Sequence, residues 1–248
     1  MDKAQTAGRV LVVGAASGIG AAAAAWLLSK GWSVAVADRD EAKLRTIVPA
    51  VSSFAACLSL DVTDETAVAA GVNEAADALG GIDALVNCVG TTGGGWASIT
   101  ETSVTHLDEL YNVNLRGAFL LTQAVLGVMR PRQYGRVLHL TSIAGKEGVA
   151  GMSSYCATKA GMVGLVKSVA REVATEGITV NGLAPAIIRT ALTQAMPDDQ
   201  YDYLLNLAPM RRAGELDEVS AMIEWIVSPA CGFTTGFIFD LSGGRADY

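Results

Sequence analysis

The sequence predicts an α/β fold, a doubly wound parallel sheet of seven strands with helices on both faces. Two observations lead to this prediction. Short runs rich in Val, Ile and Leu, typical of strands buried on both faces, alternate with longer stretches of helical character. The first of these runs ends in a glycine-rich turn that leads straight into an Ala-rich stretch. Since the chain has no repeat, linker or low-complexity segment, we expect residues 1–248 to form a single domain.

The strands are expected where apolar runs are bounded by Gly, Pro, Asp or Asn. They cover residues 9–13, 33–37, 53–60, 82–88, 136–141, 178–183 and 237–241. The helices are expected at residues 19–30, 40–48, 64–79, 103–129, 152–175 and 215–228, with a helical or mobile insert at 190–207. Gly31 follows the first helix, Thr63 is a candidate cap for the third, and Pro131 stops the fourth.

Composition excludes several classes of protein. The chain of 248 residues is 51% hydrophobic and 17% charged, so it can bury a large core. Its net charge of −7 argues against a nucleic-acid partner. The four cysteines lie far apart and only two histidines are present, so we expect reduced thiols and no metal site. The longest apolar helix face, 21–28, is too short to span a bilayer and no signal peptide is apparent, so we expect a soluble, cytoplasmic protein without a membrane partner.

A glycine-rich turn joins the first strand to the first helix. Gly14, Gly18 and Gly20 are spaced as G-x-x-x-G-x-G, and Ser17 and Ile19 complete the turn. Glycine lets the backbone approach a pyrophosphate, which binds at the positive end of the helix that follows. The spacing differs from the general G-x-G-x-x-G fingerprint, and an ordinary tight turn would also use glycine. Its place between a buried strand and a helix favours a dinucleotide site.

Acidic residues at two strand ends extend this site. Asp38 follows the second strand, where a carboxylate can accept hydrogen bonds from the adenosine ribose and repel a 2′-phosphate. We therefore expect NAD rather than NADP as the cofactor, although the neighbouring Arg39 could pair with a phosphate. Asp61 and Val62 follow the third strand, where the adenine is expected, but a turn or helix-cap aspartate explains Asp61 as well.

A serine, a tyrosine and a lysine follow the fifth strand. Ser142 lies just beyond it, and Tyr155 and Lys159 are four residues apart, on one face of the next helix. Hydride transfer between an alcohol and a ketone needs a proton-transfer group at the reacting oxygen, and tyrosine, with a pKa of about 10, is a weak acid on its own. A lysine ammonium one turn away stabilises the phenolate and lowers that pKa. Such a pair is common by chance on exposed helix faces; the serine and the glycine turn favour a catalytic site.

Taken together, these motifs resemble the short-chain dehydrogenase/reductase family, which has a Rossmann fold, in the type whose chains are about as long as this one. The resemblance covers nearly the full chain. It includes the glycine turn, the Ser–Tyr–Lys set, Asn87-Cys88-Val89-Gly90 after the fourth strand, Asn114 on the fourth helix and Pro185-Ala186-Ile187-Ile188-Arg189-Thr190 after the sixth strand.

The resemblance implies a role for each of these residues. Tyr155 would be the general acid and base, Ser142 would hydrogen-bond the reacting oxygen, and Lys159 would hold the nicotinamide ribose and tune Tyr155. Asn114 would position water for a proton relay. The residues implied to contact the cofactor also include Asn87, Gly90, Pro185, Ile188 and Thr190.

The substrate is expected among the loops after strands four, five and six. Trp96 would line or cap this pocket, and Lys146 and Arg189 near its opening would bind an anionic substrate or remain solvated surface side chains. Segments 145–148, 184–190 and 240–248 are similar to a subgroup of NAD-linked enzymes that oxidise sugar-acid intermediates, among them dehydrogenases of 2-keto-3-deoxy sugar acids.

Two other functions are compatible with the same scaffold. One is reduction of a 3-oxoacyl thioester, against which Asp38 argues because that step usually draws on NADPH. The other is a catalytically silent nucleotide sensor, against which the complete Ser–Tyr–Lys set argues. The resemblance also implies a homotetramer, with one contact through the two long helices at 103–129 and 152–175 and a second at the tail.

Overall fold

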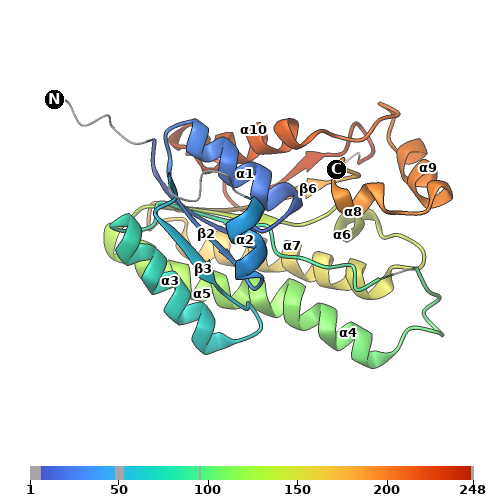
Figure 1. Ribbon diagram of the computed structural model, residues 1–248, viewed down its shortest axis with the longest axis horizontal. Helices are drawn as coiled ribbons and strands as arrows, with labels where there is room; N and C mark the ends of the chain where they lie inside the picture. The colour runs from blue at the N-terminus through green and yellow to red at the C-terminus, as the bar shows by residue number, and fades with distance from the viewer. Residues whose placement is uncertain (1–6, 48–52, 95, 247–248) are drawn as a thin grey trace.

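The computed structural model describes residues 7–47, 53–94 and 96–246. Its strands form one seven-stranded parallel sheet in the order β3-β2-β1-β4-β5-β6-β7, with helices covering both faces (Figure 1). The predicted fold class is confirmed. The strands are β1 (Arg9–Val13), β2 (Ser33–Asp38), β3 (Ala56–Ser59), β4 (Ala84–Asn87), β5 (Gly135–Leu140), β6 (Ile178–Pro185) and β7 (Ile238–Leu241). Val48, the predicted end of the second helix, and Asp247 and Tyr248 in the tail lie outside the described residues.

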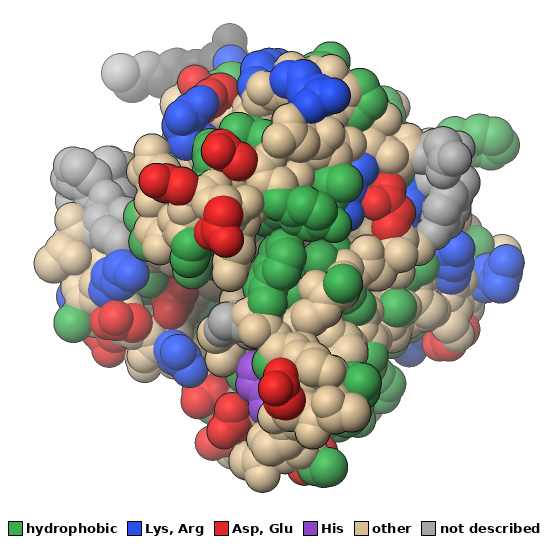
Figure 2. All heavy atoms as spheres, turned by 90° about the vertical axis from the view of Figure 1, so that its right-hand side faces the viewer, with side chains coloured by type: hydrophobic (Ala, Val, Ile, Leu, Met, Phe, Trp, Pro, Cys, Tyr) green, Lys and Arg blue, Asp and Glu red, His purple; other side chains and the backbone are tan. Residues whose placement is uncertain are grey.

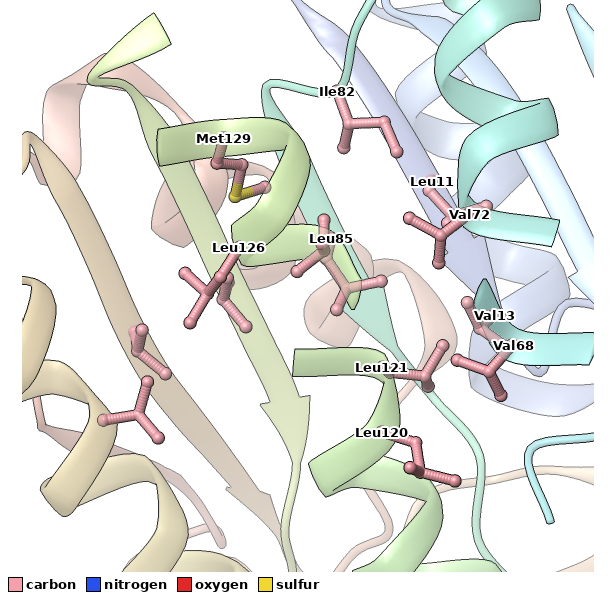
Figure 3. Close-up of a cluster of buried hydrophobic side chains, with 14 of the residues drawn as sticks. Leu11, Val13, Val68, Val72, Ile82, Leu85, Leu120, Leu121, Leu126 and Met129 are labelled. Carbon is pink, nitrogen blue, oxygen red and sulfur yellow. The ribbon is translucent and has the colours of Figure 1, made fainter. Parts of the chain in front are cut away.

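The central strands present alternate side chains to the two helical layers. Leu11 and Val13 join a buried cluster with α3 (Glu65–Leu79), α5 (Gly117–Met129) and α7 (Ser153–Val173), part of which is drawn in Figure 3. Val10 and Val12 join a second cluster on the other face, with α1 (Gly18–Ser29), α2 (Glu41–Ile47) and α10 (Leu216–Val227). Each fully buried side chain of this size stabilises the fold by about 1.5–3 kcal/mol, so both helical layers are held to the same strands.

The helical stretch predicted at 103–129 is continuous but not uniform. It begins with α4 (Val104–Leu110), whose first turn is capped by Ser103, because the Ser103 hydroxyl accepts a hydrogen bond from the His106 N–H at 3.1 Å. A π-helical segment, η2 (Tyr111–Arg116), separates α4 from α5. A π-helical turn rotates the side chains that follow it relative to a regular helix and is frequent at functional sites. Here it contains the fully buried Asn114.

Three strands are shorter than predicted, the seventh by a single residue at its start and the third and fourth by more. The third was predicted from Ser53 and the fourth from Ile82, but β3 begins at Ala56 and β4 at Ala84. Phe54 and Ile82 are nevertheless buried. Apolar side chains are therefore buried in the residues that precede each strand as well as in the strand itself. For this reason the apolar run in the sequence is longer than the strand.

The predicted cap of the third helix is wrong. Asp64, not Thr63, precedes α3, and its Oδ1 accepts hydrogen bonds from the N–H groups of Thr66 at 2.8 Å and Ala67 at 3.0 Å. Thr63 instead donates its N–H and its hydroxyl to Asp61, each at 2.8 Å. A carboxylate caps a helix N-terminus at least as well as a threonine hydroxyl, and Asp64 is one residue closer to the helix.

Several short helices complete the chain. The predicted insert at 190–207 contains α8 (Ala191–Gln194) and α9 (Asp198–Leu207), and an unpredicted short helix, α6 (Ala144–Glu147), follows β5. Single 3-10 turns cover Arg130–Arg132 and Pro229–Cys231. Among the described residues, no helix is both long enough and apolar enough to cross a bilayer.

Candidate active site

The predicted functional residues follow strand ends on one edge of the sheet. All six strand pairings are parallel, so the carboxyl ends of β1, β4, β5 and β6 meet there. β1 lies between β2 and β4, the position where strand order reverses and where ligands bind in open α/β sheets. Figure 2 faces this edge and shows apolar side chains at its centre between acidic and basic ones.

The glycine turn packs directly against the loop after β4. Gly14 has a φ of 82°, and a Cβ at this position would lie 2.9 Å from the backbone of Cys88 and of Val89. Only glycine permits this approach. Ser17 precedes α1 and its side chain makes no capping hydrogen bond, so the N–H groups of the first helical turn are open to an anion.

Asp38 ends β2 beside this turn. Its Oδ2 accepts a hydrogen bond from the Ala16 N–H at 3.0 Å, and its Oδ1 accepts one from the Asp40 N–H at 3.1 Å. Arg39 is exposed. Hydrogen bonds from Thr63, aided by the charge of Arg39, lower the pKa of Asp61. The Arg39 cation therefore acts electrostatically on Asp61 after the third strand, while the Asp38 carboxylate is hydrogen-bonded at the glycine turn.

A buried hydrogen-bond chain shapes the loop after β4, and it contains a histidine that sequence analysis missed. Asn87 Nδ2 lies 3.0 Å from Nδ1 of His139, and Asn87 Oδ1 accepts a hydrogen bond from the Val89 N–H at 3.0 Å. His139 Nε2 lies 2.9 Å from the Thr122 hydroxyl, which donates to the Ala118 carbonyl at 2.7 Å. Both ring contacts of His139 are hydrogen bonds when it carries its proton on Nε2, because Asn87 then donates to Nδ1 and Nε2 donates to the Thr122 hydroxyl. Burial, with the charge of Lys159, lowers the pKa of His139 to about 4, which keeps the ring neutral.

Ser142, Tyr155 and Lys159 come together at the end of β5. Lys159 is buried, and its Nζ donates to the Leu140 carbonyl at 2.7 Å and lies 5.8 Å from the centre of the Tyr155 ring. The Ser142 hydroxyl accepts a hydrogen bond from the Ala144 N–H at 3.1 Å. Burial lowers the pKa of Lys159 to about 8.

The predicted direction of the Tyr155 shift is wrong for the chain without its cofactor. Burial raises the pKa of the phenol, and a hydrogen bond with Ser142 opposes the rise only in part. The Lys159 ammonium donates its hydrogen bond to the Leu140 carbonyl rather than to the Tyr155 hydroxyl.

Asn114 joins the loop after β4 to α7. Its Oδ1 accepts a hydrogen bond from the Thr91 N–H at 2.8 Å, and its Nδ2 donates to the Thr91 carbonyl at 2.9 Å and to the Thr158 hydroxyl at 3.1 Å. Both amide protons are used, and one lone pair of Oδ1 remains for a further donor. A side chain at Gly90 would lie 3.1 Å from Lys159 Nζ, so this loop also touches the lysine.

The residues after β6 close the site from the other side. The Pro185 carbonyl accepts a hydrogen bond from the Ile143 N–H at 3.1 Å, which ties the loops after β5 and β6 together. Ile188 is buried, and Thr190 caps α8. The Thr190 methyl lies 3.8 Å from the position of a Cβ on Gly18, so the last predicted cofactor residue reaches the glycine turn.

A cavity of about 270 Å³ opens beside Tyr155. Most of its side chains carry hydroxyl, imidazole or carboxylate groups, and four of the lining residues lie in the loops after strands four and five, where the substrate is expected. The lining comprises Thr92, Gly93, Ala97, Glu101, Thr102, Ser103, His106, Gly151, Met152, Ser153, Ser154 and Tyr155. His106 is the third residue of α4, where its N–H donates to the capping Ser103 hydroxyl.

The three residues predicted to contact the substrate lie outside this lining. Trp96 packs edge-to-face on Tyr203 of α9, with ring centres 5.7 Å apart. Lys146 Nζ lies 3.6 Å from a carboxylate oxygen of Asp240, and Arg189 Nε lies 3.0 Å from Glu215. Both cations are thus directed to carboxylates of the same chain. Within the described part of the chain, no group of three or more His, Cys, Asp or Glu side chains gathers as a metal site would.

Comparison with known proteins identifies the family. Residues 14–245 match the protein-family model described as enoyl-(acyl carrier protein) reductase, one of the short-chain dehydrogenase models. The chain belongs to the short-chain dehydrogenase/reductase family. As a member of this family it is a nicotinamide-linked oxidoreductase that acts on CH–OH groups, which confirms the predicted class of enzyme.

Two relatives show the range of functions near this chain. A 2-dehydro-3-deoxy-L-rhamnonate dehydrogenase (NAD(+)) from Sphingomonas sp. (strain SKA58) is 37% identical over 243 residues, 98% of this chain and 97% of the relative. A 3-oxoacyl-[acyl-carrier-protein] reductase from Vibrio harveyi is 34% identical, over 94% of this chain and 95% of the relative.

Solved structures share the fold over nearly the whole chain. The crystal structure of gox2181 superimposes with a TM-score of 0.91 at 28% identity, covering 97% of this chain and 96% of that one. ElxO with NADP bound superimposes with a TM-score of 0.88 at 28% identity, covering 96% and 98%.

The buried Lys159 generates a prediction on stability. Its pKa falls from 10.5 to about 8 on folding, so at neutral pH the folded chain holds a charge that burial opposes. The cost is fully present below about pH 8 and is relieved as pH rises towards the unfolded value. We expect Lys159→Met, without cofactor, to be more stable than the wild type at pH 7 by roughly 1–3 kcal/mol, with the gap closing by about pH 10.

Urea unfolding at both pH values measures this difference. The exposed Lys167 on the same helix provides the control, because Lys167→Met removes a charge that is not buried. A Lys159→Met variant that is less stable than the wild type at pH 7 contradicts the prediction.

Proposed function

We propose that this chain interconverts a secondary alcohol and a ketone with NAD as the hydride carrier, and that its cofactor and catalytic residues belong to one domain. The observation that carries the proposal is the meeting of Ser142, Tyr155 and Lys159 beside both the glycine turn and a polar cavity. When bound, the nicotinamide accepts a hydride from the carbon that carries the hydroxyl, or returns one to the ketone.

The side chains of the chain handle the proton and the cofactor. Tyr155 takes the hydroxyl proton in oxidation and returns it in reduction, while Ser142 donates a hydrogen bond to the reacting oxygen. Lys159 holds the nicotinamide ribose, and an ammonium near the reacting oxygen favours the phenolate form of Tyr155. The free lone pair of Asn114 Oδ1 accepts a hydrogen bond from a water that passes the proton to solvent.

The other residues predicted at the cofactor site hold the dinucleotide. Gly14, Ser17, Gly18, Ile19 and Gly20 receive the pyrophosphate at the N-terminus of α1. Towards the adenosine lie Asp38, Arg39, Asp61 and Val62, and towards the nicotinamide lie Asn87, Gly90, Pro185, Ile188 and Thr190.

NAD preference rests on Asp38. Its carboxylate is fixed at the glycine turn by the Ala16 N–H, where it meets the adenosine ribose and repels a 2′-phosphate. The cation of Arg39 favours Asp61 instead. The relative from Sphingomonas is named as an NAD(+) enzyme, whereas ElxO binds NADP, so relatives alone do not decide the cofactor.

We expect Asp38→Ala to narrow the preference for NAD over NADP by at least about tenfold in kcat/KM, because it removes the repulsion of the 2′-phosphate. Steady-state kinetics with both cofactors measure this ratio. The exposed Asp40→Ala is the control, since the Asp40 side chain caps α2 through the Lys43 N–H rather than facing the turn. A wild-type enzyme with the higher kcat/KM for NADP overturns the assignment.

For the substrate we propose a hydroxylated or keto sugar acid. The cavity beside Tyr155 is lined by Thr92, Thr102, Ser103, Ser153 and Ser154 hydroxyls together with Glu101 and His106. Such groups can hydrogen-bond the hydroxyls of a polyhydroxylated chain. The relative from Sphingomonas acts on 2-dehydro-3-deoxy-L-rhamnonate, a compound of this class.

The second candidate is reduction of a 3-oxoacyl thioester, which the 34% identical relative from Vibrio harveyi supports. Asp38 argues against it, because that reduction usually draws on NADPH. A non-catalytic nucleotide sensor is the third candidate, and the assembled Ser–Tyr–Lys set argues against that.

NADH formation across a panel of sugar acids, hydroxy acids, polyols, steroids and hydroxyacyl thioesters tests these candidates. We expect turnover of a sugar acid with NAD, reduced by at least about a hundredfold in Tyr155→Phe, which lacks the proton-transfer group. Turnover of only the thioester assigns the second function. Binding of NADH with no turnover of any class supports the sensor.

We further propose a homotetramer located in the cytoplasm. Exposed apolar side chains gather on two parts of the surface. Val104, Leu107, Tyr111 and Phe119 lie on the long helical stretch predicted to form one contact, and Trp225, Phe233 and Phe237 lie near β7, close to the tail predicted to form the other. Exposed patches of this kind mark contacts between subunits. We expect light scattering to give four times the mass of the chain, and the mass of one chain contradicts the proposal.

A further inference from the structure

The short helix α6 (Ala144–Glu147) touches two of the proposed catalytic residues. The Ala144 N–H donates to the Ser142 hydroxyl at 3.1 Å. A side chain on Gly145 would lie 2.7 Å from the carbonyl carbon of Lys159, so the backbone of α6 rests directly on that of α7 at the lysine. Any shift of α6 therefore moves Ser142 and Lys159 relative to each other.

This helix cannot hold its own position. It has four residues, too few to form a stable helix alone, and it contains a glycine. Lys146 and Glu147 each form an ion pair with a residue near position 240. Lys146 Nζ lies 3.6 Å from Asp240 Oδ2, and Arg245 Nε donates to Glu147 Oε2 at 2.8 Å.

These two ion pairs differ from the others described in the chain. The side chains of Lys146 and Arg245 are each 7% exposed, whereas the cations of the other described pairs are at least 25% exposed. A largely buried cation is costly to leave without its partner, so each pair strongly favours one arrangement.

A hydrogen-bonded turn after β7 places Arg245 beside α6. Ser242 donates its hydroxyl to Asp240 Oδ1 at 2.6 Å and accepts hydrogen bonds from the N–H groups of Arg245 at 2.9 Å and Ala246 at 3.1 Å. Asp240 thus pairs with Lys146 and also anchors the turn that returns the chain to Glu147. The same segments, 145–148 and 240–246, carried part of the sequence resemblance to sugar-acid dehydrogenases.

We infer that Asp240 and Arg245 are positioning residues of the active site, which act through α6 to hold Ser142 and Lys159 in register with Tyr155. The inference rests on the proposed catalytic roles of Ser142, Tyr155 and Lys159. Lys146 belongs to the contacts that join α6 to Asp240 and Arg245, and not to a site for a substrate anion.

Reversal of the Glu147–Arg245 pair tests the inference. Arg245→Glu and Glu147→Arg each place like charges together, and we expect each to lower kcat by about tenfold or more while KM for NAD stays within about twofold. The double variant restores opposite charges and recovers most of kcat. Since the hydrogen bond from Ser142 then opposes the rise in the pKa of Tyr155 less well, the single variants also shift the pH profile of kcat for oxidation to higher pH.

The exposed Arg45–Glu41 pair on α2 provides the matched control, with side chains 56% and 42% exposed, and Arg45→Glu leaves kcat unchanged. Thermal unfolding of each variant checks that the fold is intact, and Arg245→Lys, which keeps the charge, retains more activity than Arg245→Glu. Unchanged kcat in both single variants, or a double variant no more active than the singles, overturns the inference. Full activity of Tyr155→Phe instead overturns the proposed catalytic roles, so the two failures are distinguishable.

Discussion

The close approach of the loops after β1 and β4 is the contact on which the rest of the site depends. The α-carbon of Gly14 rests against the backbone of Cys88 and Val89, and this approach brings the cofactor turn within reach of the loop that carries Gly90 and Thr91. Asn114 then ties Thr91 to α7, the helix of Tyr155 and Lys159. A larger residue at position 14 would separate the two halves of the site, whatever its effect on the sheet.

Burial determines the electrostatics of the centre. Lys159, Tyr155 and His139 all lie in a low-dielectric environment, and each has a pKa shifted towards its neutral form. The neutral His139 serves the hydrogen-bond chain to Asn87. Burial disfavours the charged forms of the lysine and the tyrosine, and hydrogen bonds to a bound dinucleotide and substrate oxygen would offset that cost.

The sequence predicted the parts of the site that depend on local structure. Ser142 directly follows a buried strand, and Tyr155 and Lys159 share a helix face, so neither relation needs knowledge of distant contacts. The π-helical segment around Asn114 was not predictable in the same way, because a single extra residue in a helical turn leaves the apolar pattern nearly unchanged. The predicted starts of the third and fourth strands were too early because Phe54 and Ile82 are buried in loops, and buried loops and buried strands have similar compositions.

Contacts between segments that are distant in the sequence could not be predicted from local sequence patterns. The lining of the cavity by His106 and Glu101 depends on how α4 lies against the start of α7. Lys146 was predicted near the substrate because the sequence does not show its ion pair with Asp240, which lies almost a hundred residues later in the chain. Asp240 and Arg245 are therefore synthesised well after α6 and β6. The earlier strands of the sheet can begin to form during translation before α6 acquires these two partners.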